Sequence, residues 1–323
     1  MRYEIPIDEA LVDELFPFWA SIFGEILPDF SREVFLGQET AYNRGTLYLM
    51  RRAGEQLMGT ALLMHSKSVP ALAGLGEVTT NPQFRGQGIA TELCSQALAD
   101  FHRAGGEALF LGTVNPAAAR IYHRLGWRKL AGANVMANIS SGISPEEFLV
   151  DYFRRIDKVE VSIAGPDVRV SMVPLSLTPH DHQVLDANIG LYSCRYQTQN
   201  SCMGLYARYA DILADGDGAF FAGRTADGRL VGLSTARPDG VGGCQIDGFV
   251  HNNFSSAWSD LVEAACAWAR AEGISTLTAI LSVEDEEKQA LFQSIGFVYN
   301  GSGKAFQIEG RRVESCKMKR CFN

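Results

Sequence analysis

Two distant stretches of the chain share one order of apolar and polar positions. In residues 46–64 an apolar run is followed by two arginines, a turn at Ala53-Gly54 and a second apolar run. In residues 219–236 the turn falls at Asp227-Gly228, again between two apolar runs. Apolar positions on both sides of a glycine turn are typical of β-hairpins. Each stretch therefore predicts a pair of antiparallel strands.

After each hairpin the pattern predicts a further strand and then a long helix. Apolar residues recur at helical spacing in residues 88–104 and again in residues 258–271. Each segment ends in a similar phrase, and glycine there is common just past a helix C-terminus. The two phrases are Arg103-Ala104-Gly105-Gly106 and Arg270-Ala271-Glu272-Gly273.

Both halves then close in the same way. A strand is predicted over residues 108–113 and 276–282, and a shorter helix over 116–125 and 284–295. Each short helix ends at glycine followed by an aromatic residue. Self-similarity in one order indicates a duplicated unit, although one large α/β domain with a coincidental rhythm is the alternative.

The fold class expected is therefore α/β, with two lobes that each hold a mixed, mostly antiparallel sheet flanked by helices. Serine, glycine and proline cluster near residues 140–146, as linkers often do. This places the lobes at residues 1–142 and 143–323. Residues 145–156 have a helical pattern between them.

Length and composition agree with two globular lobes and exclude several other classes. The chain has 323 residues, 46% of them hydrophobic, and a formal net charge of -8. An acidic balance argues against a general nucleic-acid binder. The seven cysteines are odd in number and include no Cys-x-x-Cys pair, so neither a disulfide framework nor a metal site is expected.

We expect a cytoplasmic protein without membrane contact. Residues 1–10 contain no apolar core of signal-peptide length. No segment approaches the ~20 apolar residues that a membrane helix needs.

The strand before the first long helix runs into a glycine-rich loop. Residues 78–90 read Val-Thr-Thr-Asn-Pro-Gln-Phe-Arg-Gly-Gln-Gly-Ile-Ala. Gly86 and Gly88 have no Cβ, so backbone amides can approach an anion closely. The helix start adds unpaired N–H groups and a positive dipole end, and Arg85 adds a full charge. The loop therefore predicts a pyrophosphate site, whereas the dinucleotide and P-loop patterns do not fit.

This loop resembles the acyl-CoA signature of the GNAT superfamily of N-acetyltransferases, Arg/Gln-x-x-Gly-x-Gly/Ala, which residues 85–90 match in full. A second stretch, with Asn115, Tyr122 and Gly126-Trp127, is similar to the family's Asn…Ala-x-x-x-Tyr-x-x-x-Gly-Phe pattern. The resemblance covers residues 46–127 well and the remainder only through the repeat. It implies two tandem GNAT-like lobes with an acyl-CoA site in the first.

The resemblance also implies how acetyl-CoA would be held as cosubstrate. The loop with Arg85 and Gly86 and the amides that follow would bind the pyrophosphate, the next strand's backbone would pair with the pantetheine arm, and Asn115 would contact CoA. The amides are those of Gln87, Gly88, Ile89, Ala90 and Thr91, and the strand residues are Val78, Thr79 and Thr80. A backbone amide near Val78 or Thr79 would serve as the oxyanion donor.

Two side chains are candidates for proton transfer. Tyr122 is the expected general acid, because a phenol pKa of about 10 suits a leaving thiol; the alternative is a tyrosine that only packs on CoA. Glu77 is the expected base, directly or through water, provided it is desolvated. Glu77 is placed at the start of its strand, and a solvent-facing residue is the alternative. For His102 and His123 a surface position is favoured over a role as base, and Cys94 is expected to pack.

The second lobe is expected to keep the fold and to lose the cofactor chemistry. When the helix ends are aligned, residues 252–257 stand where the first lobe has residues 85–90, without the glycines or the arginine. Phe292 stands in the place of Tyr122, and Ser282 in that of Asn115. Structural cover, substrate binding and dimerisation remain open as roles.

The function expected is direct transfer of an acetyl group from acetyl-CoA to a primary amine of a small molecule. Glu25 or Asp29 could meet a cationic amine, and residues 186–217, with four tyrosines, could form helices that wall a substrate cleft or simply pack. The alternatives are a non-catalytic acyl-CoA binder or sensor and an acyltransferase acting on a peptide or protein amine. No metal and no nucleic-acid partner are expected, and a homodimer stays open.

Overall fold

A computed structural model describes residues 1–24, 30–52, 56–214 and 218–322 of the chain. The chain forms two compact units. The first contains Met1–Phe148, Arg169–Val173 and Asn200–Ala207, and the second contains Leu149–Val168, Pro174–Gln199 and Arg208–Asn323. The first division thus lies six residues beyond the expected boundary at 142/143, and two short later segments fold with the first unit.

The first unit is built on a mixed sheet of seven described strands in the order β1-β2-β3-β4-β5-β7-β6. Neighbouring strands are antiparallel except for β4 and β5, which run parallel. The strands are β1 (Arg2–Glu4), β2 (Asn43–Arg51), β3 (Leu57–Ser66), β4 (Leu72–Thr80), β5 (Ala108–Gly112), β6 (Arg128–Lys129) and β7 (Val135–Ile139). The first hairpin, β2 and β3, is confirmed, while its expected turn at Ala53-Gly54 lies outside the described residues.

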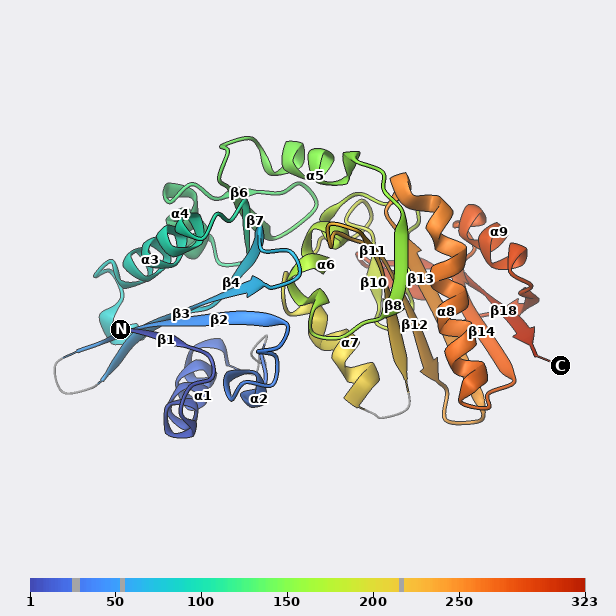
Figure 1. Ribbon diagram of the computed structural model, residues 1–323, viewed down its shortest axis with the longest axis horizontal. Helices are drawn as coiled ribbons and strands as arrows, with labels where there is room; N and C mark the ends of the chain where they lie inside the picture. Colours follow the sequence, from blue (N-terminus) through green and yellow to red (C-terminus); the bar gives the residue numbers. More distant parts are fainter. Residues whose placement is uncertain (25–29, 53–55, 215–217, 323) are drawn as a thin grey trace. The chain divides into compact units, whose positions relative to one another are not determined.

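Helices cover both faces of this sheet (Figure 1). Helices α3 (Ile89–Arg103) and α4 (Pro116–Arg124) lie on one face, and α1 (Glu9–Phe23) and α2 (Arg32–Phe35) lie on the other. The apolar side of α3, with Leu93, Cys94 and Phe101, is buried against the sheet in one hydrophobic cluster. The helix ends at Arg103, and Gly105, two residues beyond it, has a φ of 78°, the left-handed conformation that glycine adopts freely.

The second unit repeats this plan. Its main sheet has seven described strands in the order β15-β18-β14-β13-β12-β11-β8, and β13 and β14 form its parallel pair. The strands are β8 (Val159–Ile163), β11 (Ala219–Thr225), β12 (Leu230–Pro238), β13 (Gly243–Val250), β14 (Thr276–Ser282), β15 (Val298–Ser302) and β18 (Ser315–Cys321). Two short pairs accompany it: β9 (Val184–Asp186) with β10 (Leu191–Tyr192), and β16 (Phe306–Ile308) with β17 (Arg311–Val313).

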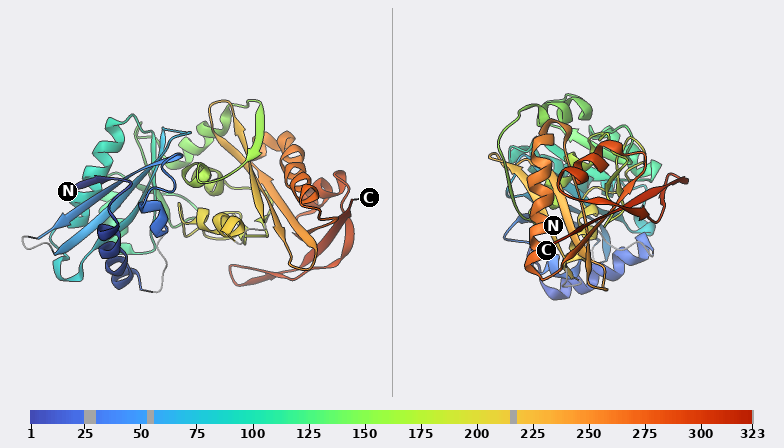
Figure 2. Two further views of the ribbon diagram at one scale, coloured as in Figure 1. Left: turned by 60° about the horizontal axis from the view of Figure 1, so that its bottom comes forward. Right: turned by 90° about the vertical axis from the view of Figure 1, so that its right-hand side faces the viewer.

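The remaining helices are α5 (Pro145–Arg154), α6 (Val168–Leu177), α7 (Leu205–Ala214), α8 (Trp258–Ala271) and α9 (Glu286–Ser294). In the second unit α8 and α9 lie on one face of the sheet and α7 lies on the other (Figure 2). Residues 186–217, expected to be helical, contain strand β10 and one described helix, α7.

The internal repeat is therefore present in the fold. The first unit has the order β4, 3-10 helix η1 (Pro82–Phe84), α3, β5, α4, and the second has β13, 3-10 helix η2 (Asn252–Ala257), α8, β14, α9. The expected α/β class with two mixed sheets flanked by helices is confirmed. Within the described part of the chain no helix is long and apolar enough to span a bilayer. The described residues contain no disulfide, and every cysteine except Cys321 is buried.

Candidate functional site

The parallel strands β4 and β5 separate after a short stretch of pairing. They pair only at Leu72–Ala108, Ala73–Leu109 and Gly74–Phe110, although β4 continues to Thr80. Beyond this point β4 is paired with β3 on one side, through Gly59 and Thr60, and with no described strand on the other. Residues 78–80 thus form a strand edge whose backbone N–H and C=O groups can pair with an extended ligand.

A β-bulge lies where β4 leaves β5. The register with β3 shifts between Thr60 and Leu62, and Glu77 has a φ of 49°. Leu75 packs in the cluster under α3. Thr79, four residues later, instead forms a hydrogen bond with Thr60, which is also bonded to Trp19 of α1 on the opposite face of the sheet. An uninterrupted strand would place both on one face. The expectation that Glu77 begins the strand is wrong, because it lies near the end of β4, and its side chain is buried rather than solvent-facing.

A chain of hydrogen bonds fixes this bulge from the α1 face. The Trp19 indole Nε1 donates to Thr60 Oγ1 at 2.9 Å, and Thr60 Oγ1 donates to the carbonyl oxygen of Glu77 at 2.6 Å. Thr79 Oγ1 lies 2.7 Å from the same hydroxyl. Thr60 has one proton and two acceptor sites, so Thr79 is the donor in that last bond. All the hydrogen-bonding capacity of Thr60 is thereby used.

The two glycines of the glycine-rich loop both have a left-handed backbone conformation. Gly86 and Gly88 have φ values of 78° and 80°, and a Cβ at either position would meet no atom within 4 Å. Gly88 is the N-cap of α3, and none of the described side chains caps this helix. The first intrahelical bond there runs from the Glu92 amide to the Gly88 carbonyl. The amides that precede Glu92 and the exposed Arg85 side chain therefore make the loop electropositive and leave it open to an anion.

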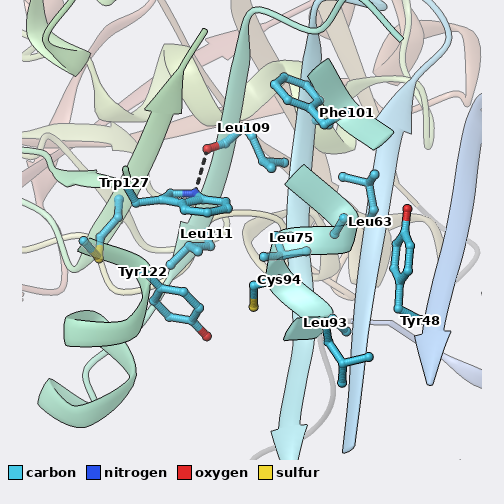
Figure 3. Close-up of a cluster of buried hydrophobic side chains, with 14 of the residues drawn as sticks. Tyr48, Leu63, Leu75, Leu93, Cys94, Phe101, Leu109, Leu111, Tyr122 and Trp127 are labelled. Atoms are coloured by element: carbon cyan, nitrogen blue, oxygen red, sulfur yellow. Dashed lines mark hydrogen bonds between the residues drawn. The ribbon is translucent and has the colours of Figure 1, made fainter. Parts of the chain in front are cut away.

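Asn115 and Tyr122 belong to α4. The Asn115 side chain accepts a hydrogen bond from the Ala117 amide at 2.9 Å and caps the helix, and Pro116 follows at the first helical position. Tyr122 is buried, and its ring centroid lies 6.2 Å from that of Trp127. Trp127 is fixed by its Nε1 bond to the carbonyl oxygen of Leu109 (Figure 3).

The Tyr122 hydroxyl is directed away from Trp127, toward the side of Cys94 (Figure 3). No described residue forms a hydrogen bond with it. Burial raises the pKa of Tyr122 well above its ordinary value, and the neighbouring Cys94 and Cys202 thiols add to this. The phenol therefore keeps its proton throughout the physiological range and has it available to donate, as a weaker acid than an ordinary tyrosine.

The sequence predicts that the segment Asn200–Ala207 belongs to the second lobe, within residues 186–217 that could wall a substrate cleft, and not that it folds with the first unit. In the structure this segment folds with the first unit and places Met203 against Gly74 and Gly76 of β4. Two glycines at alternate positions of a strand indicate that another group approaches its backbone closely. That signal was present in the sequence, but it does not identify the approaching group.

The other expected residues are placed as follows. Glu25 and Asp29, considered for a cationic acceptor, lie outside the described residues. His102 and His123 are exposed, and His102 Nε2 lies 3.3 Å from Asn138 Oδ1. Cys94 is buried in the core cluster, as expected.

The corresponding region of the second unit has a different backbone. Residues 252–257 form η2, and the Trp258 amide that follows bonds to the Ser255 carbonyl. The Phe254 amide bonds to the carbonyl oxygen of His251 at 2.7 Å, as the Phe84 amide does to that of Asn81 at 2.9 Å. The difference lies at the start of α8, where the Trp258 amide is used locally.

The structure also shows the second-unit counterparts of Tyr122 and Asn115. Phe292 is buried between Trp258 and Phe297, at ring distances of 5.0 and 5.1 Å. The Ser282 hydroxyl accepts from the Glu284 amide at 3.1 Å, as the Asn115 side chain does from an amide two residues on.

The residues of the first unit fit an acyl-CoA. Both loop glycines adopt a conformation that other residues avoid, the amides that follow are uncapped, and the neighbouring strand edge is open. Phosphate groups bind at such helix starts. Among the described residues there is no group of three or more His, Cys, Asp or Glu that could hold a metal ion.

Comparison with solved structures returns several acetyltransferases. A ribosomal-protein-S5-alanine acetyltransferase from Vibrio fischeri matches at 11% identity and a TM-score of 0.40, over 52% of this chain and 94% of that one. An N-acetyltransferase from Staphylococcus aureus Mu50 matches at 16% and 0.41, over 51% and 97%. A phosphinothricin acetyltransferase from Sinorhizobium meliloti, in complex with AcCoA, matches at 14% and 0.40, over 50% and 88%.

The sequence itself matches one protein family over part of its length. No curated protein matches the chain. Residues 10–127 match the sequence model of the acetyltransferase (GNAT) family, and this range contains the strand edge, the glycine loop, Asn115 and Tyr122. The amino-terminal part of the chain, residues 10–127, is thus a GNAT-family acetyltransferase domain.

Proposed function

We propose that the first unit binds acetyl-CoA and transfers its acetyl group directly to a primary amine of a small molecule. The observation that carries this proposal is the backbone of the loop before α3. Gly86 and Gly88 are both left-handed there, and the helix that follows starts without a capping side chain. Such a start lacks the hydrogen bond that a capping side chain would provide, whereas an anionic ligand would be stabilised by it.

The chain offers a continuous set of groups to the ligand. The amides of Gln87 to Thr91 and the charge of Arg85 would hold the pyrophosphate, and the backbone of Val78, Thr79 and Thr80 would pair with the pantetheine arm. The Oδ1 atom of Asn115 is used in capping α4. Its Nδ2 atom would therefore be the group that donates to the ligand.

Two side chains would handle the protons. Bound acetyl-CoA supplies an activated acetyl group. Tyr122 holds its proton at Oη because burial raises its pKa, and it would deliver that proton to the departing thiolate. The buried carboxyl group of Glu77 would take a proton from the amine, directly or through water.

In the second unit we propose that the fold is kept without acyl-CoA binding. The loop glycines are missing there, the Trp258 amide at the start of α8 bonds to the Ser255 carbonyl, and Phe292 has no proton to give. Structural support of the chain is then the simplest role for this unit.

The proposal is tested by incubating the purified full-length protein with acetyl-CoA and a panel of primary amines, including polyamines, amino acids and a short peptide. Acetylated products are detected by mass spectrometry. An acetylated small amine, absent with Gly88→Trp and strongly reduced with Tyr122→Phe, is the expected result. Binding of acetyl-CoA without any acetylated amine would favour a sensor, and acetylation of the peptide alone would favour a peptide acyltransferase.

A further inference from the structure

The segment Asn200–Ala207 covers the place where β4 and β5 separate. A Cβ on Gly112, at the end of β5, would lie 3.4 Å from the Asn200 carbonyl oxygen and 3.5 Å from the Cys202 nitrogen. On β4, a Cβ at Gly76 would lie 3.3 Å from the Met203 methyl carbon. A Cβ at Gly74 would overlap the Met203 sulfur. The backbone of this segment therefore lies against β5, and its Met203 side chain lies against β4.

Met203 occupies the face of β4 opposite to α3. Ala73 and Leu75, which alternate with the two glycines, pack in the cluster under α3, so Gly74 and Gly76 face the other way. Met203 is fully buried there. The absence of side chains at Gly74 and Gly76 leaves the space that the Met203 side chain fills.

Contacts at both ends hold the segment in place. At one end Asn134 Nδ2 donates to Asn200 Oδ1 at 2.7 Å. At the other, the Arg169 guanidinium lies 4.3 Å from the ring centroid of Tyr206, and its NH1 lies 3.5 Å from the Met203 carbonyl oxygen. Arg169 is itself fixed by a buried ion pair with Glu39, with bonds of 2.5 and 2.9 Å. These contacts thus fix the position of Met203.

Tyr122 reaches the same gap from the other face of the sheet. It belongs to the cluster under α3, yet the Cys202 thiol, one residue before Met203, is close enough to contribute to its raised pKa. The Ser201 hydroxyl oxygen in this segment is buried and bonds to none of the described residues. Since buried hydroxyls nearly always have a partner, Ser201 offers a polar contact to a bound group.

We propose that Met203 limits the first unit to short acyl groups. This inference rests on the proposed acyl-CoA function. If the thioester lies beside the Tyr122 hydroxyl, an acyl chain that extends through the gap between β4 and β5 meets Met203. Each additional methylene would need space that this side chain already fills, and a close-packed interior does not yield it. Met203 would then determine acyl-chain specificity, and it takes no part in proton transfer.

The test compares the binding of acetyl-CoA and butyryl-CoA by calorimetry, with the full-length wild-type protein and Met203→Ala. For the wild type we expect butyryl-CoA to bind about tenfold more weakly or worse, a usual penalty when a pocket rejects extra methylenes. Met203→Ala should bring the affinities for acetyl-CoA and butyryl-CoA to within about threefold of each other. Met318→Ala, which truncates an equally buried methionine in the second unit, should leave the wild-type preference intact.

Met203→Leu serves as a second variant if Met203→Ala folds poorly. Leucine keeps most of the volume but lacks the terminal methyl group beside Gly76, so it should relax the preference partly. The inference is overturned if both acyl-CoAs bind the wild type equally, or if neither Met203 variant changes their ratio. If no acyl-CoA binds the wild type at all, the proposed function fails together with it.

Discussion

The Thr60 hydroxyl donates a hydrogen bond of 2.6 Å to the carbonyl oxygen of Glu77. This contact joins β3 to the bulge of β4 and holds a non-glycine residue at a positive φ. It is supported in turn by the Trp19 indole and the Thr79 hydroxyl. The position of the open strand edge therefore depends on one buried threonine.

Thr60→Val should destabilise the protein by about 1–3 kcal/mol, because it removes the buried acceptor of the Trp19 N–H group and the hydroxyl that donates to the Glu77 carbonyl. Urea unfolding followed by tryptophan fluorescence measures this. Thr278→Val, at a buried β14 threonine whose hydroxyl bonds to no described residue, should have a smaller effect. Equal effects of the two substitutions would mean that the Thr60 bonds contribute little.

Gly88 and Gly105 give a matched pair at the two ends of α3. Their φ values are 80° and 78°, and a Cβ at either meets no atom within 4 Å. Alanine at each should cost a similar amount, about 1–2 kcal/mol, through its left-handed backbone. Only Gly88→Ala should also weaken acetyl-CoA binding, by about tenfold, which corresponds to 1.4 kcal/mol. A similar loss of binding with Gly105→Ala would place the ligand elsewhere.

Tyr122→Phe should lower the acetylation rate by about 10²–10⁴-fold, the usual contribution of a general acid, while acetyl-CoA still binds. Tyr48→Phe is the control, because Tyr48 lies in the same core cluster on β2, where its hydroxyl bonds to Asp100. A rate unaffected by Tyr122→Phe would reduce Tyr122 to a packing residue.

The pH dependence of the rate gives an independent check on Tyr122. A group with a raised pKa stays protonated below that pKa, so Tyr122 keeps its proton as the pH passes about 10, the ordinary tyrosine value. The rate should therefore not fall between pH 8 and about 10 through loss of this proton. A decline in that range that disappears in Tyr122→Phe would contradict the raised pKa.

Stability should fall as the pH is lowered through the histidine range. Burial lowers the pKa of His65 to about 4, and the Arg44 charge acts in the same direction. The folded state therefore keeps His65 neutral, while the unfolded chain binds a proton below about pH 6.5. The free energy of unfolding should drop between pH 6.5 and 4. The drop should be shallower in His65→Gln but unchanged in His123→Gln, at an exposed position on α4.

The Arg169–Glu39 pair should be worth much more than an exposed pair of similar geometry. Both side chains are about 95% buried, so Arg169→Met leaves an uncompensated carboxylate and should cost about 3–5 kcal/mol. Arg195→Met breaks the exposed pair with Asp181 and should cost about 0–1 kcal/mol. Urea midpoints of the two variants measure the difference, and comparable losses would refute the anchoring role of Arg169.

The sequence predicted the parts of the fold that depend on neighbouring residues. The helices over residues 89–103 and 258–271 follow from apolar spacing and from a glycine past each end. The open backbone before α3 follows from Gly86 and Gly88, because few other residues adopt their conformation. These signals are local, and they recur in the same order in both halves.

The missed features depend on contacts between residues far apart in the chain. Glu77 has no intrinsic preference for a positive φ, and its bulge is stabilised by Thr60 on the neighbouring strand. Met203 contacts Gly74 and Gly76 although residues 77–202 separate it from them in the sequence, and no periodicity encodes such a contact. The pattern of glycines marked the close approach but not the side chain that makes it.

The central claim is that one unit binds acetyl-CoA and the other does not, and calorimetric titration of the full-length protein with acetyl-CoA tests it most directly. The account predicts one site per chain, which Gly88→Trp abolishes. Two sites per chain would show that the turn before α8 also binds the ligand. No binding at millimolar ligand would contradict the acyl-CoA site itself.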